Sequence, residues 1–203
     1  MTSDVADHLR ARPIAGAVAL AGYDTESTEL APSKSDANDE LDDLRDGLFD
    51  AHERLFAEAR RSVLVVLQGT DCSGKNGTIK HVVIAMNPAG VRATSFVEPT
   101  EAERREHFLD RYRRELPDPG HLAVFDRSHY EDLIEPTVRG DLDDHGFDAR
   151  VGEIVAFERG LVDAGTTVVK CLLHISYDEQ RERLLRRLRR DDKRWKFDSA
   201  DVE

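Results

Sequence analysis

A glycine-rich loop with a lysine follows directly after an apolar run in this sequence. Residues 69–78 read Gly-Thr-Asp-Cys-Ser-Gly-Lys-Asn-Gly-Thr and fit the pattern G-x-x-x-x-G-K, and residues 63–67 before them are all apolar. A buried strand that leads through such a loop into a helix directs backbone N–H groups and the positive end of the helix dipole toward one point. This segment, called the P-loop below, therefore predicts a phosphate site, and a glycine loop without a ligand is the less favoured interpretation. Its expected phosphate contacts are Gly69, Ser73, Gly74, Lys75, Asn76, Gly77 and Thr78.

Two aspartates offer oxygen ligands for a magnesium ion. The residue after the lysine of a P-loop is usually Ser or Thr, whose hydroxyl binds Mg²⁺, but here it is Asn76. Asp71 lies inside the loop, where a negative charge close to phosphate oxygens requires a cation between them. Asp126 ends the apolar run 122–125, in a Walker B arrangement. Asp126 alone would more often be a turn or cap residue, but with Asp71 and Lys75 it predicts a metal and phosphate site.

The elements that must position these loops alternate along the chain. Periodicity from Asp39 onward (Leu41, Leu44, Leu48, Leu55, Ala59) predicts an amphipathic helix, whereas residues 1–38 predict a poorly ordered N-terminal arm. Residues 140–146 predict a polar loop. Alternating strands and helices indicate an α/β fold with a doubly wound parallel sheet and helices on both faces. The expected strands are near 63–67, 91–96, 121–125 and 167–174, and the expected helices are near 75–86, 100–115, 149–163 and 177–190.

Positive charge is concentrated near the end of an otherwise acidic sequence. The net charge is −12, which argues against a general nucleic-acid binder, yet residues 181–196 hold nine Lys and Arg against three Asp and Glu. A basic helix is often only a solvated surface. The concentration here favours a polyanion as partner, and a long phosphate chain fits better than nucleic acid because Trp195 is the one aromatic residue available for base stacking.

Four segments, in this order and at these spacings, resemble the polyphosphate kinase 2 family. They are residues 69–80, 87–88, 125–132 and 193–196, and the resemblance covers roughly 41–203. Members of that family transfer a phosphoryl group between inorganic polyphosphate and a nucleotide, with Mg²⁺ and a P-loop kinase fold that carries a helical lid. The segment Asp-Arg-Ser-His-Tyr-Glu-Asp at 126–132 is similar to the branch that accepts nucleoside monophosphates as well as diphosphates.

The resemblance implies a role for each matching residue. Some of these residues have a plainer alternative. His129 and Tyr130 could equally be an aromatic pair that packs at the start of a helix, Arg127 could form a surface ion pair, and Glu131 could simply favour the helix N-terminus. The implied catalytic residues are Asp71, Lys75, Lys80, Asp126, Arg127 and Arg194, with Asp71 and Asp126 as metal ligands. The expected nucleotide contacts are Arg111, His129, Tyr130 and Glu131. The expected polyphosphate contacts, in a lid of about 177–203, are Arg183, Arg187, Arg190, Lys193, Arg194 and Lys196.

The sequence thus predicts a P-loop kinase domain over 39–203 that transfers a phosphoryl group in line, without a covalent enzyme intermediate. The expected cofactor is Mg²⁺, with Mn²⁺ as an alternative. Expected partners are inorganic polyphosphate, nucleotides such as AMP, ADP or GDP, and further copies of the chain in a dimer or tetramer, with no nucleic acid and no membrane.

Without an apolar run near the ~18 residues that span a bilayer, and without a signal peptide, the expected location is the cytoplasm. Two alternative functions stay open, an ATP-dependent small-molecule or nucleotide kinase and a non-catalytic polyphosphate-binding fragment. The second has its motive in the family pattern, which continues past the lid, whereas this chain stops at Glu203.

Overall fold

The computed structural model describes residues 7, 9–12, 18–29 and 33–192. The chain divides into two compact units, Met1–Leu44 and Arg45–Glu203, which are described separately. The first unit contains the 3-10 turn η1 (Leu20–Gly22) and the start of helix α2 (Lys34–Glu58). This helix begins five residues earlier than Asp39 because the Ser33 hydroxyl accepts a hydrogen bond from the Asp36 N–H over 3.1 Å and so caps its first turn. The predicted N-terminal arm therefore includes the first residues of a helix.

The second unit is built on a parallel sheet of four strands. Strands β1 (Ser62–Gly69), β2 (Val91–Ser95), β3 (Leu122–Asp126) and β4 (Thr166–Leu173) lie in the order β2-β3-β1-β4. All three strand pairs are parallel, so the carboxyl ends of the strands meet at one edge. The residues of β3 are all buried, as expected for a strand with neighbours on both sides and helices on both faces. The four predicted strands are confirmed.

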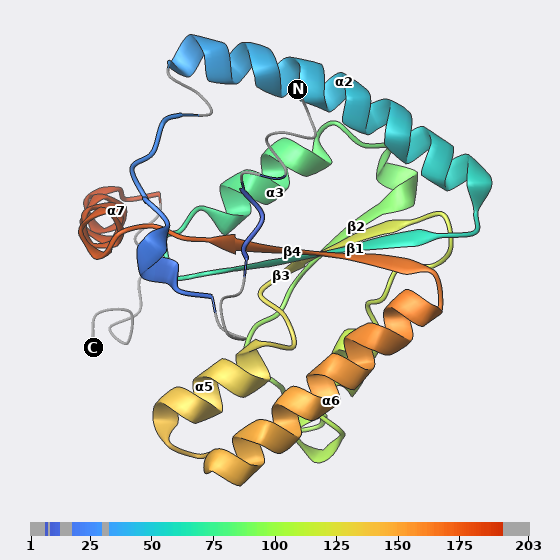
Figure 1. Cartoon of the computed structure of the whole chain (residues 1–203), viewed down its shortest axis with the longest axis vertical. Helices are drawn as coiled ribbons and strands as arrows, with labels where there is room; N and C mark the ends of the chain where they lie inside the picture. Colours follow the sequence, from blue (N-terminus) through green and yellow to red (C-terminus); the bar gives the residue numbers. More distant parts are fainter. Residues whose placement is uncertain (1–6, 8, 13–17, 30–32, 193–203) are drawn as a thin grey trace. The chain divides into compact units, whose positions relative to one another are not determined.

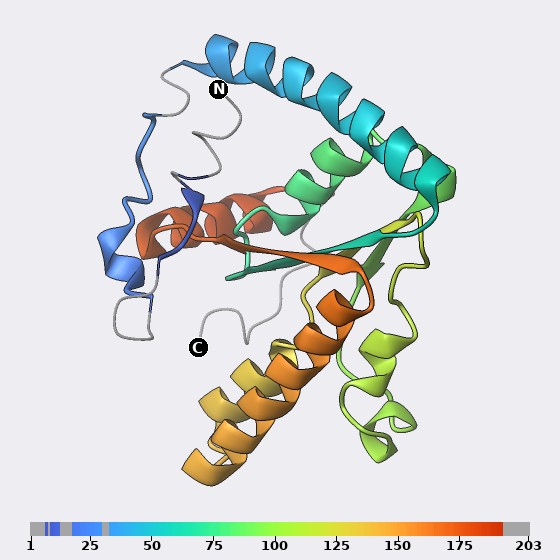
Figure 2. The ribbon, with the colours of Figure 1, turned by 45° about the vertical axis from the view of Figure 1, so that its right-hand side comes forward.

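Helices cover both faces of this sheet, as Figures 1 and 2 show for α3 and α6. Helix α3 (Lys75–Val83) packs Ile79 and Val82 on a core that includes Leu67 and Val124. On the other face, helix α6 (Asp144–Asp163) contributes Phe157 and Leu161, and helix α4 (Asp110–Arg113) contributes Tyr112, to a core with Leu64 and Phe125. The predicted doubly wound α/β fold is therefore confirmed.

The helices differ from the prediction in three places. The single helix expected near 100–115 is wrong, because only the short turns η3 (Glu103–Arg105) and α4 form there, and Glu106 between them is extended. Helix α5 (Glu131–Arg139) opens at the aromatic pair His129–Tyr130, where a helix start was expected, although no helix was predicted over its length. Helix α6 begins at Asp144, inside the expected polar loop, because the Asp143 carboxylate accepts a hydrogen bond from the Gly146 N–H over 2.7 Å and caps it.

The remaining elements are the turn η2 (Pro88–Gly90) and helix α7 (Tyr177–Arg189). Ser176 caps α7 by accepting a hydrogen bond from the Glu179 N–H over 3.2 Å. Figures 1 and 2 place α7 at the end of the sheet where β4 finishes. Within the part of the chain that the structure describes, no helix is both long enough and apolar enough to cross a lipid bilayer.

Candidate active site

The P-loop connects β1 to α3 through a backbone that only glycine fits at its start. A Cβ atom on Gly69 would lie 2.6 Å from the Ser73 hydroxyl and 2.8 Å from the Leu173 carbonyl oxygen, so a side chain has no room there. Cys72 and Gly74 both have positive φ angles, of 63° and 108°. Left-handed residues within such a turn make successive N–H groups converge, which is the geometry of an anion-binding nest. The backbone of the P-loop therefore has the form of an anion-binding nest.

Lys75 is the first residue of α3 and is held by the loop that precedes it. Its ammonium group donates hydrogen bonds to the Gly69 carbonyl over 2.7 Å and to the Thr70 carbonyl over 3.2 Å. Burial lowers the pKa of Lys75, and the nearby carboxylate of Asp71 offsets part of this shift. The same ammonium group also feels the charges of Arg127, Asp126 and Glu131. The structure thus gathers these ionic groups around Lys75.

Asp126 and Arg127 reach the P-loop because of the strand register. Asp126 pairs with Leu67 of β1 and Ser95 of β2, and its side chain is buried with 7% exposure. Arg127 has a left-handed backbone, with φ of 62°, and its N–H group donates to the Leu67 carbonyl over 3.1 Å. Its guanidinium donates to the Asp71 carboxylate over 3.2 Å. The end of β3 and the P-loop therefore form one site.

The donor set of this site fits a magnesium ion. Asp71 and Asp126 come from different loops at the same edge of the sheet, and carboxylates are hard oxygen ligands. In the described residues no group of three or more His, Cys, Asp or Glu side chains is arranged as a metal site. Mg²⁺ commonly needs only one or two carboxylates, because water and substrate phosphates supply its other ligands. The two aspartates are thus sufficient as the protein part of such a site.

A small cavity of about 130 Å³ lies beside Arg127 and is lined by the segment that follows β2 and by residues of α4 and α5. Arg111 lines it with only 8% exposure, and its guanidinium donates to the Val97 carbonyl over 2.7 Å and lies 5.4 Å from the ring centre of Phe96. Glu131 lines the same cavity, and burial raises its pKa although Arg127 works against this rise. Two of the four predicted nucleotide contacts therefore meet in one cavity next to the P-loop.

The other two predicted nucleotide contacts face the core. His129 has no exposed surface, and its Nε2 atom donates to the Glu158 carboxylate of α6 over 3.2 Å. The Tyr130 hydroxyl donates to the same carboxylate over 2.7 Å, and Lys170 of β4 donates to it over 2.8 Å. Burial alone would raise the pKa of Glu158, but these hydrogen bonds lower it to about 2. In this structure His129 and Tyr130 therefore have the packing role that the sequence analysis gave as the alternative.

Sequence reasoning missed Glu158 and Lys170. The signal that marks Glu158 is its place on α6, because it follows the buried Ile154 by four residues and precedes the buried Leu161 by three. A carboxylate within such a buried stripe needs partners, which points to a polar network. Lys170 has no comparable signal, since it lies on a strand whose residues are mostly exposed or half-buried.

Helix α7 brings one predicted polyphosphate contact to the P-loop. Arg183 donates to the carbonyl oxygens of Cys72 and Ser73 over 3.1 and 3.2 Å. Arg187 is half-buried on the same helix, and Arg190 is exposed and paired with Asp192 over 2.8 Å. The remaining predictions in this segment, Lys193, Arg194 and Lys196, lie outside the described residues.

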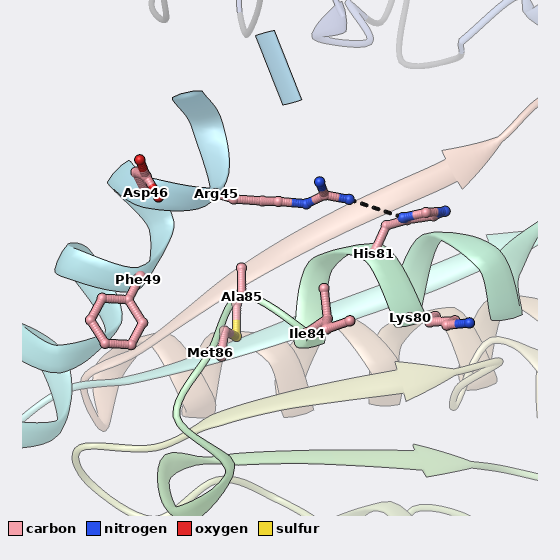
Figure 3. A pocket seen from close by; sticks show the side chains of 8 residues that line it. All are labelled: Arg45, Asp46, Phe49, Lys80, His81, Ile84, Ala85 and Met86. Carbon is pink, nitrogen blue, oxygen red and sulfur yellow. Dashed lines mark hydrogen bonds between the residues drawn. The ribbon is translucent and has the colours of Figure 1, made fainter. Parts of the chain in front are cut away.

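Lys80 lines a different hollow from the cavity beside Arg127. It is exposed on α3, and Figure 3 shows it at the rim of a separate hollow of about 450 Å³, where Arg45 and His81 are joined by a hydrogen bond of 3.1 Å. The other predicted loop contacts stay near the P-loop. Asn76 and Gly77 are exposed in the first turn of α3, and the Thr78 hydroxyl donates to the Gly74 carbonyl over 3.4 Å.

Known proteins are similar to this chain in sequence and in fold. The family model for polyphosphate kinase 2 matches residues 31–203. An AMP/ADP-polyphosphate phosphotransferase of Meiothermus ruber is 47% identical over 151 residues, which are 74% of this chain and 57% of that protein. An ADP-polyphosphate phosphotransferase of Rhodopseudomonas palustris is 35% identical over 198 residues, 92% of this chain and 68% of that protein. The chain thus spans little more than half of the Meiothermus ruber protein.

A solved structure agrees with these relatives. The crystal structure of polyphosphate kinase 2 from Arthrobacter aurescens TC1 superposes with a TM-score of 0.90 at 39% identity, covering 97% of this chain and 70% of that one. The matched segment contains both the P-loop and the strand end at Asp126, which are the two halves of the site described above. This chain belongs to the polyphosphate kinase 2 family.

Proposed function

We propose that this protein transfers a phosphoryl group between inorganic polyphosphate and a nucleoside mono- or diphosphate. The observation that carries this proposal is the meeting of Lys75, Asp71, Asp126 and Arg127 at one edge of the sheet. Two positive groups, two carboxylates and a nest of N–H groups at one point suit phosphoryl transfer. The polyphosphate donor and the AMP or ADP acceptor are supported by the names of the Meiothermus ruber and Rhodopseudomonas palustris relatives.

In the proposed reaction the chain positions charge and does little covalent chemistry. The P-loop N–H groups and Lys75 hold the donor phosphates, and Arg127 balances the negative charge that spreads over the transferred group. Asp71 and Asp126 would hold Mg²⁺, or Mn²⁺ as an alternative, and the bound ion would supply charge neutralisation at the phosphate oxygens. Lys80 and Arg194 are assigned to the same task by family resemblance alone.

The acceptor nucleotide is proposed to bind at the cavity of Arg111 and Glu131, beside Arg127. Its own phosphate oxygen attacks the terminal phosphorus of polyphosphate in line, the P–O bond to the rest of the donor breaks, and the shortened polyphosphate leaves as an anion. Because the attacking oxygen is already ionised at neutral pH, no strong general base is needed. His129 and Tyr130 act indirectly in this proposal, because their bonds to Glu158 hold the segment between Asp126 and α5. Binding of polyphosphate along α7 and beyond, a homo-oligomeric state and a cytoplasmic location stay predictions.

A donor assay tests the proposal. Purified protein is incubated with Mg²⁺ and with AMP, ADP or GDP in parallel, once with polyphosphate and no ATP and once with ATP and no polyphosphate, and the nucleotide products are separated. The proposal expects phosphorylated nucleotide from polyphosphate. Product from ATP alone would favour an ordinary kinase, and polyphosphate binding without product in any arm would favour a binding fragment.

A further inference from the structure

Two cationic side chains hold the carbonyl oxygens of the P-loop. Lys75 binds the carbonyls of Gly69 and Thr70 at the start of the loop, and Arg183 binds those of Cys72 and Ser73 in its middle. In a trans peptide the carbonyl and the N–H group point in opposite directions. A bond that fixes the Ser73 carbonyl therefore also fixes the direction of the Gly74 N–H group. Arg183 therefore binds the P-loop from the side opposite to the one on which the N–H groups of the loop converge.

The guanidinium of Arg183 is itself held in place. Its Nε atom donates to the Glu179 carboxylate over 2.6 Å, one helical turn earlier, while its Nη1 atom reaches the loop. The planar guanidinium fixes both directions at once, which a lysine ammonium does not do. The two side chains are 34% and 38% exposed, and the neighbouring Leu184 is buried and anchors α7. The contact therefore connects α7 firmly to the loop.

A second pair on α7 provides a built-in comparison. Arg186 donates to Glu182 over 2.7 Å with the same spacing of four residues, but the two side chains are 60% and 66% exposed. Removing Arg186 therefore takes away the same charge and the same kind of helical pair as removing Arg183. The difference between the two variants isolates the contact with the P-loop carbonyls.

We propose that Arg183, aligned by Glu179, is a positioning residue that orients the P-loop peptides from Cys72 to Gly74 and so couples α7 to the phosphate site. This inference rests on the proposed function in one respect, that the P-loop binds the donor phosphate. It assigns Arg183 to the protein backbone and not to the polyphosphate chain, in contrast to the expectation from the charge pattern. A displacement of α7 is then transmitted to the N–H groups that bind phosphate.

Hydrogen exchange without substrate tests the positioning directly. In Arg183→Ala the amides of residues 70–75 should exchange faster than in the unaltered protein, because the loop loses the contacts that fix its peptides. In Arg186→Ala they should exchange at the unaltered rate. Glu179→Gln, which keeps the helix and weakens only the alignment of Arg183, should give a smaller change in the same direction. Equal exchange in Arg183→Ala and Arg186→Ala would overturn the proposal.

Kinetics with tripolyphosphate and a long-chain polyphosphate supply the second readout. Arg183→Ala should lower kcat by about ten- to a hundredfold with both donors, the range that a hydrogen bond from a charged donor spans. The loss in Arg186→Ala should be smaller and should be confined to the KM for the long donor. A loss in Arg183→Ala that grows with donor length would make Arg183 a polyanion contact and overturn the proposal. If the unaltered protein forms no product from either donor, the proposed function fails, and the exchange comparison still decides the role of Arg183.

Discussion

Arg127 donates a hydrogen bond to the Asp71 carboxylate over 3.2 Å, and this contact joins the end of β3 to the P-loop. The two side chains are 38% and 36% exposed. An ion pair this accessible contributes at most about 1 kcal/mol to folding. We therefore expect the Arg127–Asp71 ion pair to matter for the site more than for stability, because it places a positive and a negative group beside Lys75 before any substrate binds.

The two aspartates should be the residues on which metal dependence rests. Asp71→Asn and Asp126→Asn keep the size of each side chain and remove its charge, so each should abolish Mg²⁺-dependent turnover. Initial rates measured across a magnesium titration, with a chelator-treated sample as baseline, check this expectation.

Asn76→Ala is the matched comparison for this prediction. Its side chain occupies the position where an ordinary P-loop places the metal-binding hydroxyl, and it is exposed. Its effect should be much milder than that of either aspartate variant. The reverse ranking would show that the metal is bound in the ordinary P-loop manner.

The pH profile should reveal the environment of Lys75. Burial lowers the pKa of this lysine below its ordinary value of 10.5, and in the proposed function the charged form is the one that binds phosphate. Activity should therefore fall as the pH rises through the lowered pKa, so the alkaline limb of kcat/KM should lie below pH 10.5. In Lys75→Arg, whose guanidinium stays charged, this limb should move to higher pH. The reaction rate of the variant should be lower at every pH. An alkaline limb that is the same in both proteins would exclude Lys75 as its source.

Glu158 should stabilise the fold through His129, Tyr130 and Lys170. Because its folded pKa is about 2 and its ordinary value is 4.5, its contribution is present above pH 4.5 and is lost as the pH falls toward 2. Glu158→Gln should lower the free energy of unfolding by about 2 kcal/mol at neutral pH. This difference between the variant and the unaltered protein should shrink in acid. Urea titrations at several pH values measure this difference.

Glu153→Gln on the same helix is the control for this effect. Glu153 is 45% exposed and pairs with His107 on the surface, so its replacement should change the free energy of unfolding by less than about 1 kcal/mol. If the loss of free energy of unfolding in Glu158→Gln is no larger than this, or does not depend on pH in acid, Glu158 does not stabilise the fold through its three partners.

The half-buried Arg187 of α7 and the exposed Arg190 that follows the helix should affect long donors more than short ones. Reversing the charge of Arg187 and Arg190 together should weaken the use of long-chain polyphosphate, and added salt should imitate the change because it screens the same contacts. The ratio of kcat/KM for long and short donors, measured at several salt concentrations, is the relevant quantity. If this ratio stays constant in the variant and in salt, these arginines are only a solvated helix face.

The sequence predicted the central strands β1 and β3 well because they are short apolar runs that lead into clear loops. Leu122 to Phe125 form the most buried strand, and their continuous apolar pattern is what a strand covered on both faces requires. The segment 100–115 does not form one helix. Thr100 and Glu103 exchange the two hydrogen bonds of a capping box, which is why a helix start is recognisable there, but the chain becomes extended at Glu106 after the single turn η3.

Only the site residues that belong to a local sequence motif could be predicted from the sequence. Asp71, Lys75 and Asp126 each follow from a local pattern. The contact of Arg183 with Cys72 joins residues 111 positions apart, and the contact of Glu158 with His129 joins residues 29 apart. No local pattern encodes such pairs, because they depend on how α6 and α7 pack on the finished sheet.

The central claim is that the group around Lys75 transfers a phosphoryl group from polyphosphate to a nucleotide. The most direct measurement is the rate of ADP formation from AMP and polyphosphate, without ATP, in the unaltered protein and in Lys75→Ala. Thermal unfolding of both proteins should differ only slightly, because Lys75 contributes just two hydrogen bonds to the loop backbone. We predict product from the unaltered protein and a rate lower by about two orders of magnitude or more in the variant. Equal rates in the two proteins, or product that appears only when ATP replaces polyphosphate, would contradict the account.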